Sequence, residues 1–161
     1  MLFPFPVRED TPLYLAPMAG VSESPFRRLC RRFGADVVVT EFLSAEGIRR
    51  ENAATLDKLR FGPDERPIGV QIFGADPAAI LKKYGSRIKL MHVKDLRKGV
   101  KGDFTGSTSQ ENDVAVGTGQ LNIPEIMKAA KRSAISNYYI EDESSSVNVQ
   151  VPKTLAYLKK L

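Results

Sequence analysis

Short apolar runs alternate with segments of helical periodicity along this chain, and that alternation predicts an α/β fold with a mainly parallel sheet. Five runs have the length and the β-branched or aromatic content of buried strands. They span residues 13–18, 37–42, 68–73, 88–93 and 137–140. The shorter run at 114–116 is compatible with one more extended segment. We therefore expect one domain over residues 1–161, built from about five parallel βα units.

Helices are predicted between these strands. Ser22 or Ser24 can cap the first one, Pro25 fits its first turn, and Gly34 ends it. Its apolar residues recur at three- and four-residue spacing and form one stripe: Phe26, Leu29, Cys30 and Phe33. Further helices are expected at about 52–59, 78–84 (started by Asp76-Pro77), 124–131 and 151–161. The polar stretch 97–112 is expected to be a mobile loop.

The length of 161 residues limits the architecture. A complete eight-stranded α/β barrel usually needs about 250 residues, so there is room for only part of one. The two forms left open are a partial barrel and a flavodoxin-like open sheet. Because open strand edges readily pair with other strands, we expect a homodimer or an unusual closure.

Composition places the chain among ordinary globular proteins. Hydrophobic residues make up 42% and charged residues 27%, and the formal charge is +5. No apolar run approaches the roughly 20 residues of a membrane span, and the N-terminus does not resemble a secretory signal. A single cysteine excludes an internal disulfide framework and suits a reducing, cytoplasmic compartment. The charge is compatible with a phosphate-bearing ligand, and we expect no membrane or nucleic-acid partner.

The kind of basic residue changes at mid-chain. Residues 1–80 contain nine arginines and one lysine, whereas residues 81–161 contain three arginines and eleven lysines. With eleven and eight acidic residues respectively, the halves carry formal charges of −1 and +6. No functional demand explains so clean a switch, whereas a codon or organism bias would. We therefore expect two parents, joined near residues 77–82.

Four motifs follow the first three predicted strands: Ala16-Pro17-Met18-Ala19-Gly20-Val21-Ser22, Pro25-Phe26-Arg27, Thr40-Glu41-Phe42 and Gln71-Ile72-Phe73-Gly74. Together, over about residues 12–77, they resemble the opening of a tRNA-dihydrouridine synthase, an FMN-dependent reductase with a TIM-barrel fold. The resemblance implies that Pro17 and Met18 lie against the flavin ring and that Gln71 contacts it. On residue type alone, core packing is the other role open to Met18.

The resemblance supplies no catalytic residue. The family's catalytic cysteine follows the fourth strand, and no residue here matches its position. Cys30 lies on the apolar stripe of the first helix, where packing is its expected role. We therefore name no catalytic residue.

Motifs in the second half resemble the last strands of a sugar phosphate isomerase/epimerase, a xylose-isomerase-like barrel that uses a divalent metal. They are Leu81 to Ile88, His92-Val93-Lys94-Asp95, Val116 to Leu121, Ile123 to Ile126 and Tyr139-Ile140-Glu141. The resemblance implies that His92 and Glu141 are two of four metal ligands and that Lys94 could meet an anionic substrate group. Two ligands are normally too few for a firm site, and solvated strand-end residues are the alternative reading.

Gly117-Thr118-Gly119 precedes a helix with proline in its first turn. Exposed backbone N–H groups at such a place can bind phosphate or sulfate. Through Gly117 and Gly119, this loop could also substitute for the phosphate loop that dihydrouridine synthases carry after a later strand.

Three functions remain open from the sequence. The first is an engineered or recombined chimera of two TIM-barrel fragments without native activity. The second is an FMN-binding remnant that keeps Pro17, Met18 and Gln71. The third is a remnant of a metal-dependent sugar phosphate isomerase that keeps His92 and Glu141.

Overall fold

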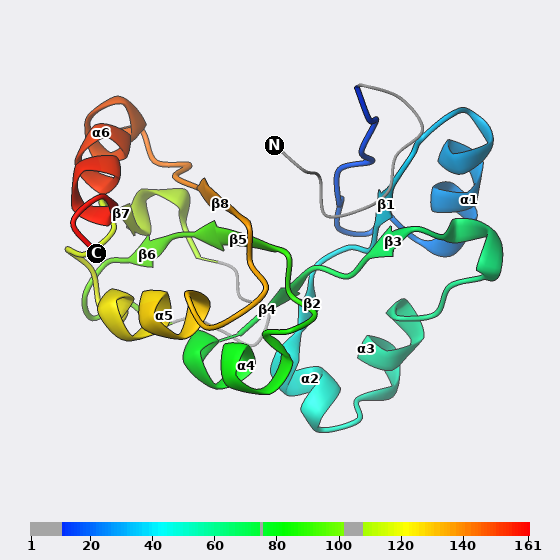
Figure 1. Cartoon of the computed structure of the whole chain (residues 1–161), viewed down its shortest axis with the longest axis horizontal. Helices are drawn as coiled ribbons and strands as arrows, with labels where there is room; N and C mark the ends of the chain where they lie inside the picture. Colours follow the sequence, from blue (N-terminus) through cyan, green and yellow to red (C-terminus); the bar gives the residue numbers. More distant parts are fainter. Residues whose placement is uncertain (1–10, 75, 102–107) are drawn as a thin grey trace. The chain divides into compact units, whose positions relative to one another are not determined.

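The computed structural model describes residues 11–74, 76–101 and 108–161 (Figure 1). The chain divides into two compact units, Met1–Ala75 and Asp76–Leu161. The fold is α/β with short parallel strand pairs, and the described strands pair two at a time without closing a barrel. The predicted mobile loop lies partly outside the described residues, at 102–107. No helix in the described ranges has both the length and the apolarity needed to cross a membrane.

The N-terminal unit contains helices and strands much shorter than the sequence pattern predicts. They are α1 (Ser24–Arg32), β1 (Val38–Val39), β2 (Leu43–Ser44), α2 (Ala45–Arg49), α3 (Ala53–Lys58), the 3-10 turn η1 (Pro63–Glu65), β3 (Ile68–Gly69) and β4 (Ile72–Phe73). Helix α3 begins where Asn52 Oδ1 accepts the N–H of Thr55 at 3.0 Å, as expected of an N-cap. Helix α2 was not predicted, because five residues that include Gly47 carry no helical period.

Strand pairing in this unit is parallel. The first predicted strand contributes only the bridge between Tyr14 and Val37. The predicted strand 37–42 contains β1, and β2 follows its end, while the predicted strand 68–73 appears as the two pieces β3 and β4. Strand β1 pairs with β3 and β2 pairs with β4. Backbone bonds from Thr40 to Gly69 (3.0 Å) and from Leu43 to Gln71 (2.9 Å) bridge the interruptions. The predicted strands 37–42 and 68–73 are therefore neighbours in the predicted parallel sense.

An ion pair lies buried beneath α1. Arg27 Nε contacts Glu65 Oε2 at 2.7 Å, and both side chains are at most 2% exposed. The guanidinium also donates to the carbonyls of Ser22 (2.7 Å) and Arg60 (2.9 Å), while Ser24 Oγ donates to Glu65 Oε1 at 2.6 Å. Buried charges are tolerated when they are paired and hydrogen-bonded in this way. The pair joins α1 to η1.

The predicted apolar stripe of α1 is largely exposed, contrary to expectation. Phe33 is 83% exposed and Leu29 is 46% exposed, whereas the buried residue of the helix is Arg27. Arg27 faces inward because it pairs with the buried Glu65, whereas Arg28 and Arg32 of the same helix are exposed. The spacing of apolar residues predicted the presence of this helix correctly, but it did not predict which face of the helix is buried.

The C-terminal unit alternates helices with strands up to four residues long. Its elements are α4 (Pro77–Tyr84), β5 (Leu90–Val93), β6 (Asp95–Leu96), the 3-10 turn η2 (Gln110–Asn112), β7 (Asp113–Val114), α5 (Ile123–Ala130), β8 (Asn137–Ile140) and α6 (Val147–Leu158). Asp76 Oδ1 caps α4 by accepting the N–H of Ala79 at 3.0 Å, and Asn122 Oδ1 caps α5 through Glu125 at 3.3 Å.

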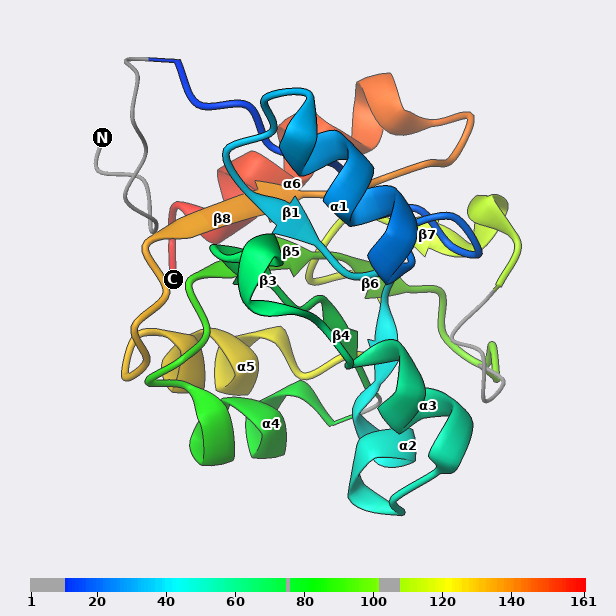
Figure 2. The ribbon, with the colours of Figure 1, turned by 90° about the vertical axis from the view of Figure 1, so that its right-hand side faces the viewer.

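Strands β5 and β8 pair in parallel, while β6 and β7 pair antiparallel. Helices α4 and α5 lie side by side within this unit (Figures 1 and 2). An apolar core joins helices, strands and loop: Leu81, Val93, Val116, Ile123, Ile126 and Ala130. The extended piece expected at 114–116 is present at 113–114, but it runs antiparallel to its neighbour.

The last helix differs from its predicted form. It begins at Val147, and Pro152 lies inside it rather than in its first turn. Leu155 is 46% exposed, whereas the polar Thr154 is 1% exposed. Thr154 Oγ1 accepts the N–H of Val116 at 2.9 Å, which explains why a polar residue faces inward.

Candidate functional site

The end of β5 directs alternate side chains to opposite sides. Val93 and Asp95 are buried, at 2% and 1% exposure. His92 and Lys94, which alternate with them, remain partly exposed. This is the two-residue period of a strand, and it places His92 and Lys94 toward solvent and Val93 and Asp95 toward the interior.

His92 and Glu141 are brought together, as the resemblance implied. The register of β5 and β8 sets Val93 beside Ile140, and the Glu141 N–H donates to the Val93 carbonyl at 3.1 Å. His92 Nδ1 then bonds to Glu141 Oε2. This hydrogen bond lowers the pKa of Glu141 to about 2. Burial of Glu141 opposes that effect, and Lys94 adds to it. The same bond raises the pKa of His92, against the lowering effects of burial and of Lys94.

Lys94 lies among three carboxylates. Its Nζ is 2.9 Å from Glu143 Oε2 and 3.2 Å from both Glu141 Oε1 and Asp113 Oδ2. Burial lowers the pKa of Lys94, but its bonds to the three carboxylates outweigh burial and raise that pKa above its ordinary value. Asp113, 2% exposed, had no role in the sequence analysis. It reaches Lys94 because β7 pairs back onto β6.

This arrangement does not fit a divalent metal. In the described part of the chain, no three histidine, cysteine, aspartate or glutamate side chains are grouped to hold a metal ion. His92 Nδ1 and both oxygens of Glu141 are engaged with neighbouring side chains. The two predicted ligands therefore form an ion pair with each other.

The loop 117–121 is arranged around Asp95. Asp95 Oδ2 accepts the N–H groups of Gly117 (3.0 Å) and Gly119 (2.9 Å), and Oδ1 accepts those of Leu121 (3.2 Å) and Leu96 (2.9 Å). A buried carboxylate therefore receives the amides that the sequence analysis assigned to a phosphate or sulfate. An anion at Gly117 and Gly119 stays a prediction, and it would have to displace Asp95.

The predicted flavin-contacting turn lies in the N-terminal unit. The Met18 N–H donates to Ser22 Oγ at 2.8 Å, and the Ser22 N–H donates to the Met18 carbonyl at 2.9 Å. Gly20 has a φ of +68°, which glycine adopts readily. Met18 is 39% exposed, so its side chain is not enclosed in a core. The turn is thus held rigidly while Met18 remains accessible.

Glu41 supports this turn, a role that sequence reasoning missed. Its Oε2 accepts the Gly20 N–H at 2.8 Å, and its Oε1 lies 2.5 Å from Lys58 Nζ. Burial raises the pKa of Glu41, but the bonds from Lys58 and Gly20 outweigh burial and leave that pKa below its usual value. Glu41 belongs to the motif Thr40-Glu41-Phe42 of the family resemblance, but the sequence analysis assigned it no role.

Gln71 lies between β3 and β4. Its carbonyl accepts the N–H of Leu43 at 2.9 Å, while its side-chain amide has no hydrogen-bond partner among the residues described. A free amide near strand ends suits the polar edge of a flat ring. The roles of Gln71, Pro17 and Met18 as flavin contacts stay a prediction.

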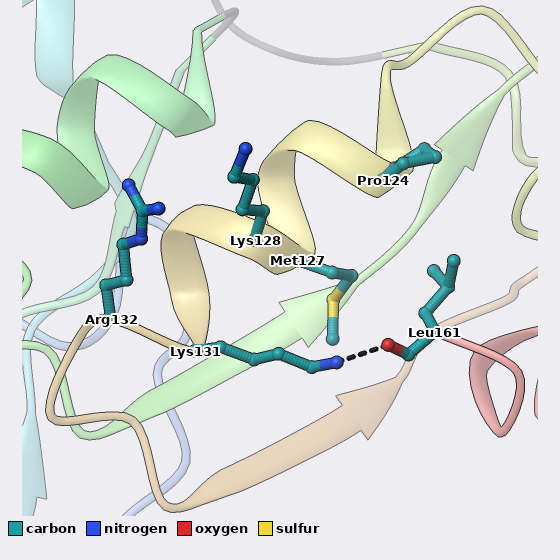
Figure 3. Close-up of a pocket in the computed structure, with 6 residues that line it drawn as sticks. All are labelled: Pro124, Met127, Lys128, Lys131, Arg132 and Leu161. Atoms are coloured by element: carbon teal, nitrogen blue, oxygen red, sulfur yellow. Dashed lines mark hydrogen bonds between the residues drawn. The ribbon is translucent and has the colours of Figure 1, made fainter.

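A separate pocket of about 380 Å³ lies along α5, from its first turn to the residues just after its C-terminal end (Figure 3). Its lining consists of Pro124, Met127, Lys128, Lys131, Arg132 and Leu161. Lys131 Nζ donates to the carbonyl of Leu161. Cations at the C-terminal end of a helix are stabilised by its dipole, which accounts for their presence there without a ligand.

Comparison with known proteins matches residues 14–84 to the family model for dihydrouridine synthase (Dus). A probable tRNA-dihydrouridine synthase of Aquifex aeolicus is 50% identical over 66 residues, which are 41% of this chain and 21% of that protein. tRNA-dihydrouridine synthase B of Pseudomonas aeruginosa is 44% identical over 90 residues, or 54% of this chain and 26% of the relative.

A longer match is to a probable tRNA-dihydrouridine synthase of Rhizobium leguminosarum, 34% identical over 110 residues, or 64% of this chain and 34% of the relative. The chain thus spans about a fifth to a third of the length of these relatives. No solved structure matches it. The predicted resemblance of the first half is confirmed over residues 14–84.

Proposed function

We propose that the chain is an engineered or recombined fusion of two barrel fragments that carries out neither parent's reaction. In this proposal residues 12–77 derive from the opening strands of a tRNA-dihydrouridine synthase, and residues 81–161 from the last strands of a sugar phosphate isomerase/epimerase. The supporting observation is the boundary between the compact units at Ala75 and Asp76. It falls next to the change from arginine to lysine along the sequence.

The reductase reaction lacks a proton donor in this chain. FMN, when bound, supplies the hydride that reduces a uridine base. Pro17 and Met18 would support the ring, and Gln71 would donate to or accept from its polar edge. Reduction also needs a proton donor within hydrogen-bond reach of the base. Cys30, half-buried on α1, matches no such position in the family.

The isomerase reaction lacks its metal ligands. Shifting protons on a sugar requires a metal held firmly enough to polarise the sugar oxygens. Only His92 and Glu141 correspond to ligands, and they are bonded to each other. The contact between them is also the one observation that favours an isomerase remnant as an alternative, and metal analysis of the purified protein would detect a bound ion.

The fusion proposal is tested by assaying the purified full chain for both reactions. One assay contains FMN, a nicotinamide reductant and unmodified tRNA, and the other contains Mn²⁺ and a panel of ketose phosphates. We expect no turnover above background in either assay. Turnover that Gln71→Ala abolishes in the first, or His92→Ala in the second, would refute the proposal.

The second candidate function is FMN binding without turnover. It is favoured by the hydrogen-bonded turn with exposed Met18 and by the side-chain amide of Gln71, which has no partner among the residues described. Titration with FMN, followed by flavin fluorescence, would then show weak saturable binding that Gln71→Ala reduces several-fold. Gln110→Ala is the matched control, since Gln110 lies in the other unit. Identical FMN titration curves for the wild type, Gln71→Ala and Gln110→Ala would exclude FMN binding at this site.

We also propose that the chain forms a homodimer. In the N-terminal unit the middle segment, β1 with β2, pairs with Tyr14 on one side and with β3 and β4 on the other. Each outer segment therefore has one edge without a strand partner among the described residues of that unit. A second copy would satisfy those edges by strand pairing. Light scattering should give twice the monomer mass, whereas a monodisperse monomer at all concentrations would exclude the dimer.

A further inference from the structure

We infer that the outer edge of β8, in the C-terminal unit, is the surface on which a second copy of this chain docks, by antiparallel pairing of β8 with β8. The inference rests on the proposed homodimer and assigns its contact. Strand β8 lies beside β5 (Figure 1), and it pairs with no other strand among the described residues. The backbone N–H and C=O groups along such an edge can pair with an added strand.

The sequence of β8 contains none of the residues that usually protect a strand edge. Residues 133–140 include no charged residue, no proline and no glycine. Tyr138 and Tyr139 are 39% and 48% exposed, and aromatic residues stabilise pairing between strands. Lysine, proline and inward-pointing charges are the features that prevent edge-to-edge pairing. The edge of β8 is therefore open to a second strand.

The two outer edges of the β5–β8 pair differ in this respect. Lys89 precedes β5, Lys94 follows it directly, and His92 lies within it. A strand that arrived beside β5 would have to accommodate these polar side chains, whereas β8 contains no charge. Because only one edge of the pair is open, two copies form a closed dimer and not a growing sheet.

The charges on either side of β8 determine the direction of pairing. Arg132, which precedes the strand, is exposed and has no ion-pair partner among the described residues. Glu141, Asp142 and Glu143 follow the strand, and Lys94 offsets only one of their three charges. Antiparallel pairing brings the Arg132 end of each copy beside the acidic end of the other. Parallel pairing would instead bring like charges together.

The edges of the N-terminal unit offer a shorter contact. Its described strands are two residues long, and its first predicted strand contributes a single bridge at Tyr14. Strand β8 instead presents four consecutive residues, Asn137–Ile140. Since each paired residue adds to the ladder of backbone hydrogen bonds, the longer strand gives a second copy the more stable contact.

The experiment changes the charge at this edge and measures the mass of the full chain. Tyr139→Lys brings a lysine of each copy to the contact, and Leu13→Lys is its control, since Leu13 is 60% exposed in the N-terminal unit. Arg132→Glu removes the charge complementarity, and its control is Lys128→Glu, the same change at an exposed lysine of α5. Sedimentation velocity over a range of concentrations gives the dissociation constant of the dimer.

We expect Tyr139→Lys and Arg132→Glu each to raise this dissociation constant about tenfold or more, because like charges then face each other. Both controls should stay within about twofold of the wild type, and added salt should weaken the wild-type dimer. Should Tyr139→Lys not fold by circular dichroism, Arg132→Glu carries the test, because its side chain is exposed.

Two results would overturn the inference in different ways. A dimer that Tyr139→Lys and Arg132→Glu leave unchanged would remove β8 as the contact, while the homodimer itself would stand. A wild-type chain that is a monomer at every concentration would overturn both the homodimer and its contact.

Discussion

The Gly119 N–H donates to Asp95 Oδ2 at 2.9 Å, which joins two residues that are 24 positions apart. Three further backbone amides, those of Leu96, Gly117 and Leu121, bond to the same carboxylate. Asp95 is 1% exposed, so these bonds replace its hydration. A loop with the glycine pattern of an anion site thus encloses an anion that the chain itself provides.

Replacing Asp95 should destabilise the C-terminal unit strongly. Each buried N–H left without a partner costs about 1–3 kcal/mol, so Asp95→Ala should lower the free energy of unfolding by at least ~3 kcal/mol. Asp95→Asn keeps one oxygen acceptor and should cost less. Urea unfolding measures both, with the exposed Glu125→Gln as control. Equal stability of Asp95→Ala and the wild type would contradict this role.

Gly117 has a φ of +91° and lies next to the ring of Tyr157, so we expect Gly117→Ala to destabilise the fold strongly. A Cβ there would lie 2.5 Å from the Tyr157 ring. Gly99 has a similar φ of +83° but open space around it, so Gly99→Ala carries only backbone strain of about 1 kcal/mol. Thermal unfolding should show Gly117→Ala less stable than Gly99→Ala by about 1–3 kcal/mol. Similar losses in both variants would mean that Tyr157 moves aside.

Breaking the buried Arg27–Glu65 pair should lower the free energy of unfolding far more than breaking the nearby exposed pair of Arg28 and Asp64. Arg27→Met leaves Glu65 buried without a counter-charge, which typically costs about 3–5 kcal/mol. Arg28 and Asp64, 2.6 Å apart and more than half exposed, form the control pair. Arg28→Ala should cost under about 1 kcal/mol. Chemical unfolding with a signal from the N-terminal unit checks both, and the double variant Arg27→Met, Glu65→Leu should recover part of the loss.

The chain has one histidine, so the titration of His92 can be followed directly by NMR. Its pKa should lie above the ordinary value of about 6.5 and should fall in Glu141→Gln. Because the folded pKa is the higher one, the His92–Glu141 pair stabilises the fold fully below about pH 6.5 and loses that contribution as pH rises through the folded pKa. Glu143→Gln, which does not contact His92, should shift the pKa less. An unchanged pKa in Glu141→Gln would refute the pair.

Several elements follow from local sequence. The Asp76-Pro77 start of α4, the bounds of α3 and the strand at 137–140 were predicted at or within a residue of their observed positions. Caps and short apolar runs act over a few residues, so their effect is visible in the sequence. The proximity of His92 and Glu141 also came from the sequence, through the family resemblance of strand ends.

The sequence by itself determined the α/β class, the places of most strands and helices, and the segment similar to dihydrouridine synthases. Only the tertiary structure decided which charges are buried and what they contact. The sequence assigned no buried role to Arg27, an anionic substrate group to Lys94, and a phosphate or sulfate to Gly117 and Gly119. In the structure Arg27 contacts Glu65, Lys94 contacts Asp113, and both glycines bond to Asp95. Each of these partners lies at least 19 positions away in the sequence. A buried charge is stable only with such a partner, and chain pairing rather than local pattern brings that partner into reach.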